Sequence, residues 1–173
     1  MLRILAVALV CVVVLGACSP TFNWREARAG STGLKAMLPC KPDKGARTVP
    51  MAGREVSLEV MGCDTGGATF AVMFADIGDA ARAGEVLALW KTATLANLRS
   101  KAGAQESTFH APGAQPLAQS VQVVATGQRA DGSQVESHAA YFARGSHVFQ
   151  AVIYTDHLKA EVAEPFFSGL RFE

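Results

Sequence analysis

Apolar and polar residues alternate along several short runs of the chain, and this pattern predicts a fold rich in β-strands. The clearest run places Val56, Leu58 and Val60 on one side with polar residues between them, as in a strand that covers a core with one face. Over residues 70–75 both alternating sets are apolar, which predicts a central strand buried on both faces. The other strand-like runs cover residues 24–29, 34–38, 119–129, 135–143 and 147–154.

The last two of these strands are predicted to form a tight antiparallel hairpin. The residues between them are Gly145-Ser146, and glycine in the first position of a two-residue loop favours a type II′ turn. If Arg144 pairs with His147, the register places Tyr141 directly opposite Gln150.

Residues 85–101 carry the longest helical pattern and are predicted to form a helix that lies on the sheet. Asp79 is a candidate for its N-cap, and Leu95 is expected to lie off its buried face. The predicted buried face consists of Val86, Leu87, Leu89, Trp90, Ala93 and Ala96.

A second helix is predicted near the end of the chain, where four apolar residues recur at intervals of four: Leu158, Val162, Phe166 and Leu170. Pro165 must either kink this helix or begin another short turn, and Gly169 is expected to end it. Between the two helices, the polar stretch 103–116 has the length of a connection across a sheet edge.

Several segments together resemble a known fold. In chain order they are LPCKP, RTVP, GREVSLEV, TFAVMFAD, LANLRSKAG and FFSGLRF. Over nearly all of residues 22–173 their order and character resemble the PsbP-like fold, to which many bacterial lipoproteins of unknown role are similar. The resemblance implies an α/β (α+β) architecture, with an antiparallel sheet of about six strands sandwiched by helices. It also implies an accessory or assembly role beside membrane complexes, and it carries no shared active site.

The start of the chain resembles the signal of a bacterial lipoprotein. Arg3 precedes an apolar core at 4–15, and Gly16-Ala17-Cys18 follows it. A basic start, a short apolar region and small residues are the features of a secretory signal, in that order. The core is too short for a membrane span, which needs about 20 apolar residues. An uncleaved anchor helix and a buried core helix are the alternatives.

This signal predicts how the chain is organised. Residues 1–17 are expected to be removed, and Cys18 becomes an acylated N-terminus at the start of a lipidated tether, residues 18–21. Residues 22–173 are then expected to form a single globular domain, because a chain of this length supports one core. The tether reaches only about 10–15 Å, so the domain is expected to face the periplasm close to a membrane of the bacterial envelope. Ser19 favours the outer membrane over the inner one.

The predicted mature chain is formally neutral. Without Arg3, 15 basic side chains face 15 acidic ones. Because the chain lacks a basic stripe, nucleic acid is not expected as a partner. Attachment to the membrane is assigned to the lipid on Cys18, and the expected protein partner is an envelope protein of unknown identity.

The cysteines support an oxidising compartment. Cys11 leaves with the signal and Cys18 is acylated, so Cys40 and Cys63 remain as a pair. In an exported protein such a pair predicts a disulfide, worth about 3 kcal/mol in the chain-entropy description. Two buried free thiols are the alternative. A catalytic redox pair is disfavoured because no C-x-x-C spacing is present.

Local catalytic motifs are absent from the sequence. It contains no G-x-S-x-G, H-E-x-x-H, phosphate-loop or dinucleotide pattern, and no cofactor is expected. Trp24 and Trp90 are expected to pack in the core rather than to stack on a ligand. The histidines lie far apart in the sequence, and none is expected to bind a metal: His110, His138, His147 and His157.

Two classes of function remain open. The first is a lipid-anchored, non-enzymatic module that binds or helps to assemble an envelope partner, or that holds a small apolar ligand between sheet and helix. The second is an envelope enzyme whose site is built from scattered polar residues such as Asp76, Ser107 and His110. The absence of local catalytic signatures favours the first class.

Overall fold

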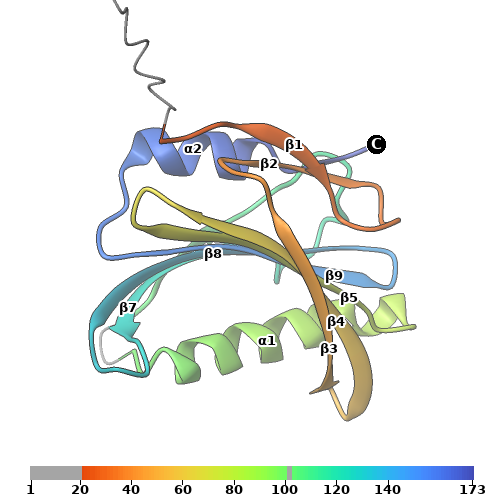
Figure 1. The fold of residues 1–173 in the computed structure, drawn as a ribbon. Coiled ribbons are helices and arrows are strands. Elements are labelled where there is room, and N and C mark those ends of the chain that lie inside the picture. Colours follow the sequence, from red (N-terminus) through yellow and green to blue (C-terminus); the bar gives the residue numbers. More distant parts are fainter. Residues whose placement is uncertain (1–20, 101–102) are drawn as a thin grey trace, which may run out of the picture.

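The structure is a computed structural model that describes residues 21–100 and 103–173. The predictions for residues 1–17 and for Cys18 fall outside the described residues. Three layers make up the described fold (Figure 1). A seven-stranded sheet lies in the middle, helix α1 (Ala83–Asn97) covers one face, and a three-stranded sheet with helix α2 (Ala160–Ser168) covers the other.

Every pair of neighbouring strands is antiparallel. The large sheet has the order β3-β4-β5-β9-β8-β7-β6, and the small sheet has the order β1-β2-β10. The strands of the large sheet are β3 (Asp43–Met51), β4 (Arg54–Thr65), β5 (Ala68–Asp76), β6 (Gln105–Thr108), β7 (Val121–Gln128), β8 (Gln134–Arg144) and β9 (His147–Thr155). Those of the small sheet are β1 (Arg25–Arg28), β2 (Leu34–Leu38) and β10 (Arg171–Phe172).

The predicted mixed α+β class and the helices on both faces are confirmed, but the prediction of about six strands in one sheet is wrong. The large sheet has seven strands, and a second sheet packs above it. The stretch 103–116 contains the edge strand β6, whose four residues are all exposed and polar. A strand with no buried face has no apolar alternation, so the pattern could not reveal it. β10 is only two residues long.

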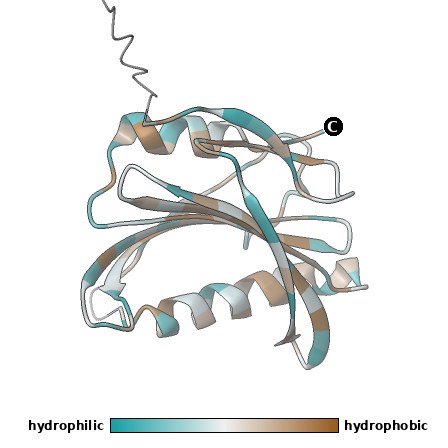
Figure 2. Ribbon diagram, in the orientation of Figure 1, coloured by the Kyte–Doolittle hydropathy of each residue, from teal (hydrophilic) through white to brown (hydrophobic). Residues whose placement is uncertain are grey.

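Two large hydrophobic cores fill the spaces between the layers, and Leu98, Ala125 and Val135 form a small third cluster. In the upper core, between the large sheet and α2 with the small sheet, lie Phe70, Val72 and Phe74. In the lower core, between the large sheet and α1, lie Ala71, Met73 and Ala75 of the same strand. The prediction that this segment is a central strand covered on both sides is therefore confirmed. Figure 2 shows hydrophobic stretches along the middle layer and in both helices, whereas β1 is largely hydrophilic.

Helix α1 is rotated relative to the face predicted from its sequence. Its buried residues are Ala83, Val86, Leu87 and Thr94. Leu89, predicted to be buried, is 50% exposed, and Leu95, predicted to lie off the buried face, packs against the lower core. Apolar residues surround this helix on several sides, so their spacing alone does not select one stripe. Asp79 caps the preceding 3₁₀ turn η1 (Ala80–Arg82) rather than α1, and accepts a hydrogen bond from the Ala81 amide.

The hairpin of β8 and β9 has the predicted register. Arg144 pairs with His147, and Tyr141 lies opposite Gln150. In the turn only Gly145 has a positive φ, +59°, which agrees with a type II′ geometry.

Helix α2 runs through Pro165 without interruption and ends at Gly169. Gly169 has an ordinary φ of −77°, so a left-handed conformation is not the reason for glycine here. A Cβ at this position would lie 2.6 Å from Cγ of Met37 on β2. Glycine therefore allows α2 to pack closely on the small sheet.

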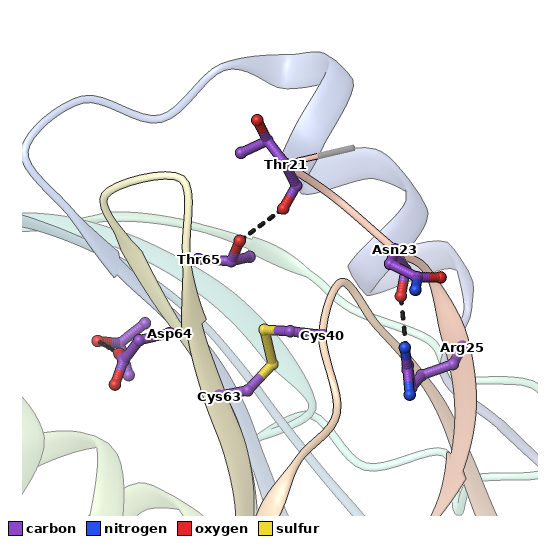
Figure 3. The surroundings of a disulfide bond; sticks show 8 residues. Thr21, Asn23, Arg25, Cys40, Cys63, Asp64 and Thr65 are labelled. Atoms are coloured by element: carbon purple, nitrogen blue, oxygen red, sulfur yellow. Dashed lines mark hydrogen bonds between the residues drawn. A yellow bond between two sulfur atoms is a disulfide. The ribbon is translucent and has the colours of Figure 1, made fainter. Parts of the chain in front are cut away.

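A disulfide joins Cys40, which follows β2, to Cys63 on β4, with 6.0 Å between the two Cα atoms (Figure 3). The predicted bridge is confirmed. Close to it, the Thr65 hydroxyl donates a 2.6 Å hydrogen bond to the carbonyl of Thr21, and the Asn23 amide donates to the carbonyl of Pro39 at 2.7 Å. The first described residues are thus held against the end of β4.

Candidate functional site

The structure does not bring together the scattered polar residues considered for an enzyme. Asp76 ends β5 and Ser107 lies on β6. These strands are four positions apart in the sheet, a separation of roughly 20 Å. His110 lines a hollow beside α2, and neither Asp76 nor Ser107 reaches it.

Asp76 has a structural role at the end of its strand. Its carboxylate accepts a hydrogen bond from the Gly78 amide at 2.9 Å. Hydrogen bonds from the Ser146 hydroxyl and from this amide lower the pKa of Asp76. A carboxylate held in its ionised form at a turn is unsuited to act as a general acid.

The hollow beside α2 contains a histidine and a carboxylate without coupling them. His110, Gln122, Glu164 and Ser168 are among its lining residues. Within the described part of the chain, no ion pair joins His110 to Glu164. The Ser168 hydroxyl donates to the backbone carbonyl of Glu164 at 2.7 Å, so it is used within its own helix. The hollow lacks an assembled nucleophile and base.

The tryptophans and the histidines also lie apart. Trp24 packs against the upper core and Trp90 against the lower one, on opposite sides of the large sheet. They cannot stack on one ligand.

His138 is half-buried on β8, and burial lowers its pKa because it disfavours the cation. No group of three or more potential metal ligands occurs in the described ranges.

A hollow lies between the seven-stranded sheet and α1, the lower helix in Figure 1. We call it the α1 cleft. Its volume is about 480 Å³, within the range of roughly 300–1,000 Å³ that small-molecule sites occupy. The C-terminal half of α1 forms one wall, and strands β3, β4, β5, β7, β8 and β9 contribute to the other. Its lining residues are Arg47, Leu58, Thr69, Met73, Trp90, Thr94, Asn97, Leu98, Gln128, Arg129, Val135, Gln150 and Tyr154.

A buried polar cluster lies at the floor of the α1 cleft. Gln150 is 1% exposed, and its Nε2 donates hydrogen bonds to the Tyr141 hydroxyl at 2.7 Å and to Thr94 Oγ1 at 3.0 Å. The Thr94 hydroxyl in turn donates to the carbonyl of Trp90 at 3.0 Å. The cluster joins two neighbouring strands to α1, and partners of this kind make the burial of polar groups tolerable.

Aromatic rings border this floor. Trp90 packs edge-on against Tyr141, with 6.4 Å between ring centroids, a geometry that aromatic pairs prefer. Burial raises the pKa of Tyr141 to about 12, and burial likewise raises that of Tyr154. Both phenols are therefore neutral hydrogen-bonding groups at physiological pH and cannot act as bases there.

The chemistry that the α1 cleft offers is recognition. Leu58, Met73 and Trp90 supply apolar contacts, and Gln150 and Thr94 supply polar atoms at the floor. No carboxylate, histidine or cysteine is among its described lining residues. Apolar walls with a few placed polar groups are the usual composition of a small-molecule site.

One signal in the sequence could have pointed to this cleft. Gln150 interrupts an otherwise apolar central strand, between Phe149 and Ala151, and a buried amide in such a place requires partners. The hairpin register predicted from the sequence places Tyr141 opposite Gln150. The contribution of Thr94 could not be seen, because it depends on the rotation of α1.

A smaller hollow of about 400 Å³ lies where the described chain begins. Thr21 and Phe22 line it together with the turn at Gly66, with Leu158 before α2 and with Val162 in α2. Phe22 and Val162 of this hollow belong to the upper core, whereas Leu58 and Met73 of the α1 cleft belong to the lower core. The two hollows therefore lie on opposite sides of the large sheet, whose two faces are covered by α2 and α1 (Figure 1). The two hollows share no lining residue.

Comparisons of the chain with protein-family models, with curated proteins and with solved structures found no match. The site is therefore interpreted from its own geometry. Among the helices of the described residues, none has the length and apolar character needed to cross a membrane.

Proposed function

We propose that this protein is a lipid-anchored protein of the bacterial envelope that acts as a non-enzymatic binding module, with the α1 cleft as its ligand site. The observation that carries the proposal is the composition of the cleft. Its apolar and aromatic walls lie over the hydrogen-bonded Gln150 and Thr94, and its lining residues supply no acid–base pair. Such a site holds a small molecule with an apolar body and at least one polar group.

The proposed anchor is the lipid on Cys18, three residues before Thr21. Thr21 is hydrogen-bonded to the end of β4 and lies beside the start of α2. An acylated Cys18 would therefore keep the α2 side within about 10–15 Å of the membrane. The α1 cleft, on the other side of the large sheet, would open away from that membrane into the periplasm. Ser19 favours the outer membrane in this proposal.

The PsbP-like resemblance supports an accessory role beside an envelope protein partner. In support of it, an antiparallel sheet lies between helices in the described chain. A module of this class would present a bound ligand, or the surface around the ligand, to its partner. Its membrane attachment would come from lipid alone, and several acyl chains hold better than the marginal binding of one.

The anchor is tested by metabolic labelling with a palmitate analogue. We expect label on the wild-type protein and none on Cys18→Ser, because that change removes the acylated group. Cys11→Ser is the matched control, since it alters a cysteine inside the predicted signal and should leave the label unchanged. Equal labelling of wild type and Cys18→Ser would overturn the anchor.

The cleft is tested with 1-naphthamide, an uncharged two-ring amide. We expect saturable binding to the purified full-length protein by titration calorimetry. Asn97→Trp places a large ring at an exposed position in the cleft lining and should abolish the binding. Ala93→Trp, at an exposed α1 position outside the lining, is the matched control and should retain it. Binding that Asn97→Trp does not weaken would show that the amide binds elsewhere.

A further inference from the structure

Among the described residues that line the α1 cleft, the charged side chains are all of one sign. They are Arg47 and Arg129. Arg129 is already neutralised, since its Nη1 lies 2.8 Å from Oδ1 of Asp156 and donates to the carbonyl of Gln134 at 2.8 Å. The Arg47 guanidinium has no hydrogen bond or ion pair with any residue that the structure describes. Of these two described arginines, Arg47 is the one whose charge is not neutralised.

The strand pairing explains why Arg47 faces the cleft. Arg47 lies opposite Leu58 in the pairing of β3 with β4, and Leu58 belongs to the lower core. Val49, two positions further along β3, packs against the same core, as alternation requires. Lys44 lies opposite Met61 of the upper core and therefore has its side chain on the other face.

Protection of a sheet edge does not account for this arginine. β3 is an edge strand, and charges or proline on an edge discourage pairing with other chains. Lys44 and Pro50 on the same strand already supply both. Arg47 adds a positive charge on the inner face, where none of the described lining residues is a carboxylate that could balance it.

The remaining lining describes the body of the ligand. Met73 and Trp90 form apolar surfaces on opposite walls, one from the sheet and one from α1. The buried amide of Gln150 lies at the floor. A volume of about 480 Å³ accommodates a molecule of one to three rings with a single charged group.

We infer that the α1 cleft binds small organic acids, with an apolar ring system between α1 and the sheet and the anionic group against Arg47. Guanidinium suits this role because its planar donors match a carboxylate, sulfonate or phosphate group and stay charged at any physiological pH. The inference rests on the function proposed above and specifies the ligand class of the same site.

The test compares 1-naphthoate with 1-naphthamide, which carry an anionic carboxylate and an uncharged carboxamide of nearly the same size on the same ring system. Calorimetric titration of the full-length protein at neutral pH should show roughly tenfold tighter binding of the acid, as one charge-assisted pair would contribute. Arg47→Gln should weaken the binding of the acid far more than that of the amide and so remove this preference. Arg47→Lys should restore part of it. Lys44→Gln is the matched control, removing a charge from the opposite face of β3, and should keep the full preference.

The outcomes separate this inference from the proposed function. Equal affinities of the wild-type protein for acid and amide, or a preference that survives in Arg47→Gln, would overturn the organic-acid inference and leave the cleft as a neutral site. Binding of neither compound would overturn the cleft itself as a ligand site. Urea unfolding of each variant shows whether the fold is retained, and Arg47 is exposed, so its substitution should not alter the unfolding midpoint.

Discussion

Gln150 and Tyr141 lie directly opposite each other on β9 and β8, and the Gln150 amide donates a 2.7 Å hydrogen bond to the Tyr141 hydroxyl. Both side chains are almost completely buried on the α1 side of the sheet, at 1% exposure each. Because Nε2 of Gln150 also donates to Thr94, the pair connects the sheet to α1. The floor of the α1 cleft thus depends on strand register and on helix position together.

The first prediction concerns the energy of this pair. We expect Gln150→Leu and Tyr141→Phe each to lower the free energy of unfolding by about 1–3 kcal/mol, because each leaves a buried polar partner less well paired. The double variant should cost about 1 kcal/mol less than the sum of the two, as for residues in direct contact. Urea unfolding of the four proteins measures this coupling. Strict additivity would mean that the hydrogen bond contributes nothing.

The second prediction concerns the disulfide. Cys40 and Cys63 are separated by 23 residues, and closure of a loop of this length stabilises a fold by about 3 kcal/mol. We expect the variant Cys40→Ser/Cys63→Ser to lose about that amount in urea unfolding. A reductant should lower the free energy of unfolding of the wild-type protein to that of the variant. The variant serves as the control, because the reductant should leave its free energy of unfolding unchanged. In denatured exported protein, a thiol reagent that modified both cysteines would contradict the bridge.

The third prediction concerns alkaline pH. The pKa of Tyr141 rises to about 12 in the folded protein because of burial, against 10.0 for an exposed phenol. The unfolded state therefore loses this proton first. The contribution of Tyr141 to the free energy of unfolding is constant below pH 10. As the pH rises from 10 towards 12, the free energy of unfolding falls by roughly 3 kcal/mol. In thermal unfolding between pH 8 and 12, the unfolding temperature of Tyr141→Phe should decline less steeply with pH than that of the wild-type protein. Parallel declines for the two proteins would contradict a raised pKa of Tyr141.

The fourth prediction compares two buried serines. Ser120 is 5% exposed, and its hydroxyl has no hydrogen-bond partner in the described ranges. Ser137 is 2% exposed and shares a hydrogen bond with the Tyr154 phenol. We expect Ser120→Ala to keep or slightly raise the free energy of unfolding, since it removes a desolvated and unpaired hydroxyl. Ser137→Ala should lower it by about 1–2 kcal/mol. Equal effects in urea unfolding would contradict the difference in pairing.

The local spacing of apolar and turn residues predicts an element correctly where neighbouring residues decide its structure. The hairpin of β8 and β9 follows from a glycine turn and from two apolar runs that meet at the predicted register. The central position of β5 follows from apolar residues on both of its faces. The pair Cys40 and Cys63 was the simplest choice in a chain with few cysteines.

Other elements depend on contacts that no local window contains. β6 has no apolar face, and it pairs only because β7 presents an open edge. Helix α1 turns Thr94 inward instead of Leu89, since the Thr94 hydroxyl meets the amide of Gln150, 56 residues away. A helix with apolar residues on several sides is oriented by the surface it packs on.

By itself, the sequence determined the strands that have an apolar face, the register of the last hairpin, the second helix and the cysteine pair. These features follow from turn geometry and from the period of apolar side chains, which act over a few residues. Tertiary structure alone decided the rotation of α1, the joining of Gln150 to Thr94 and the position of Arg47 over the same cleft. Each of these depends on which surfaces meet when strands and helices from distant parts of the chain pack together.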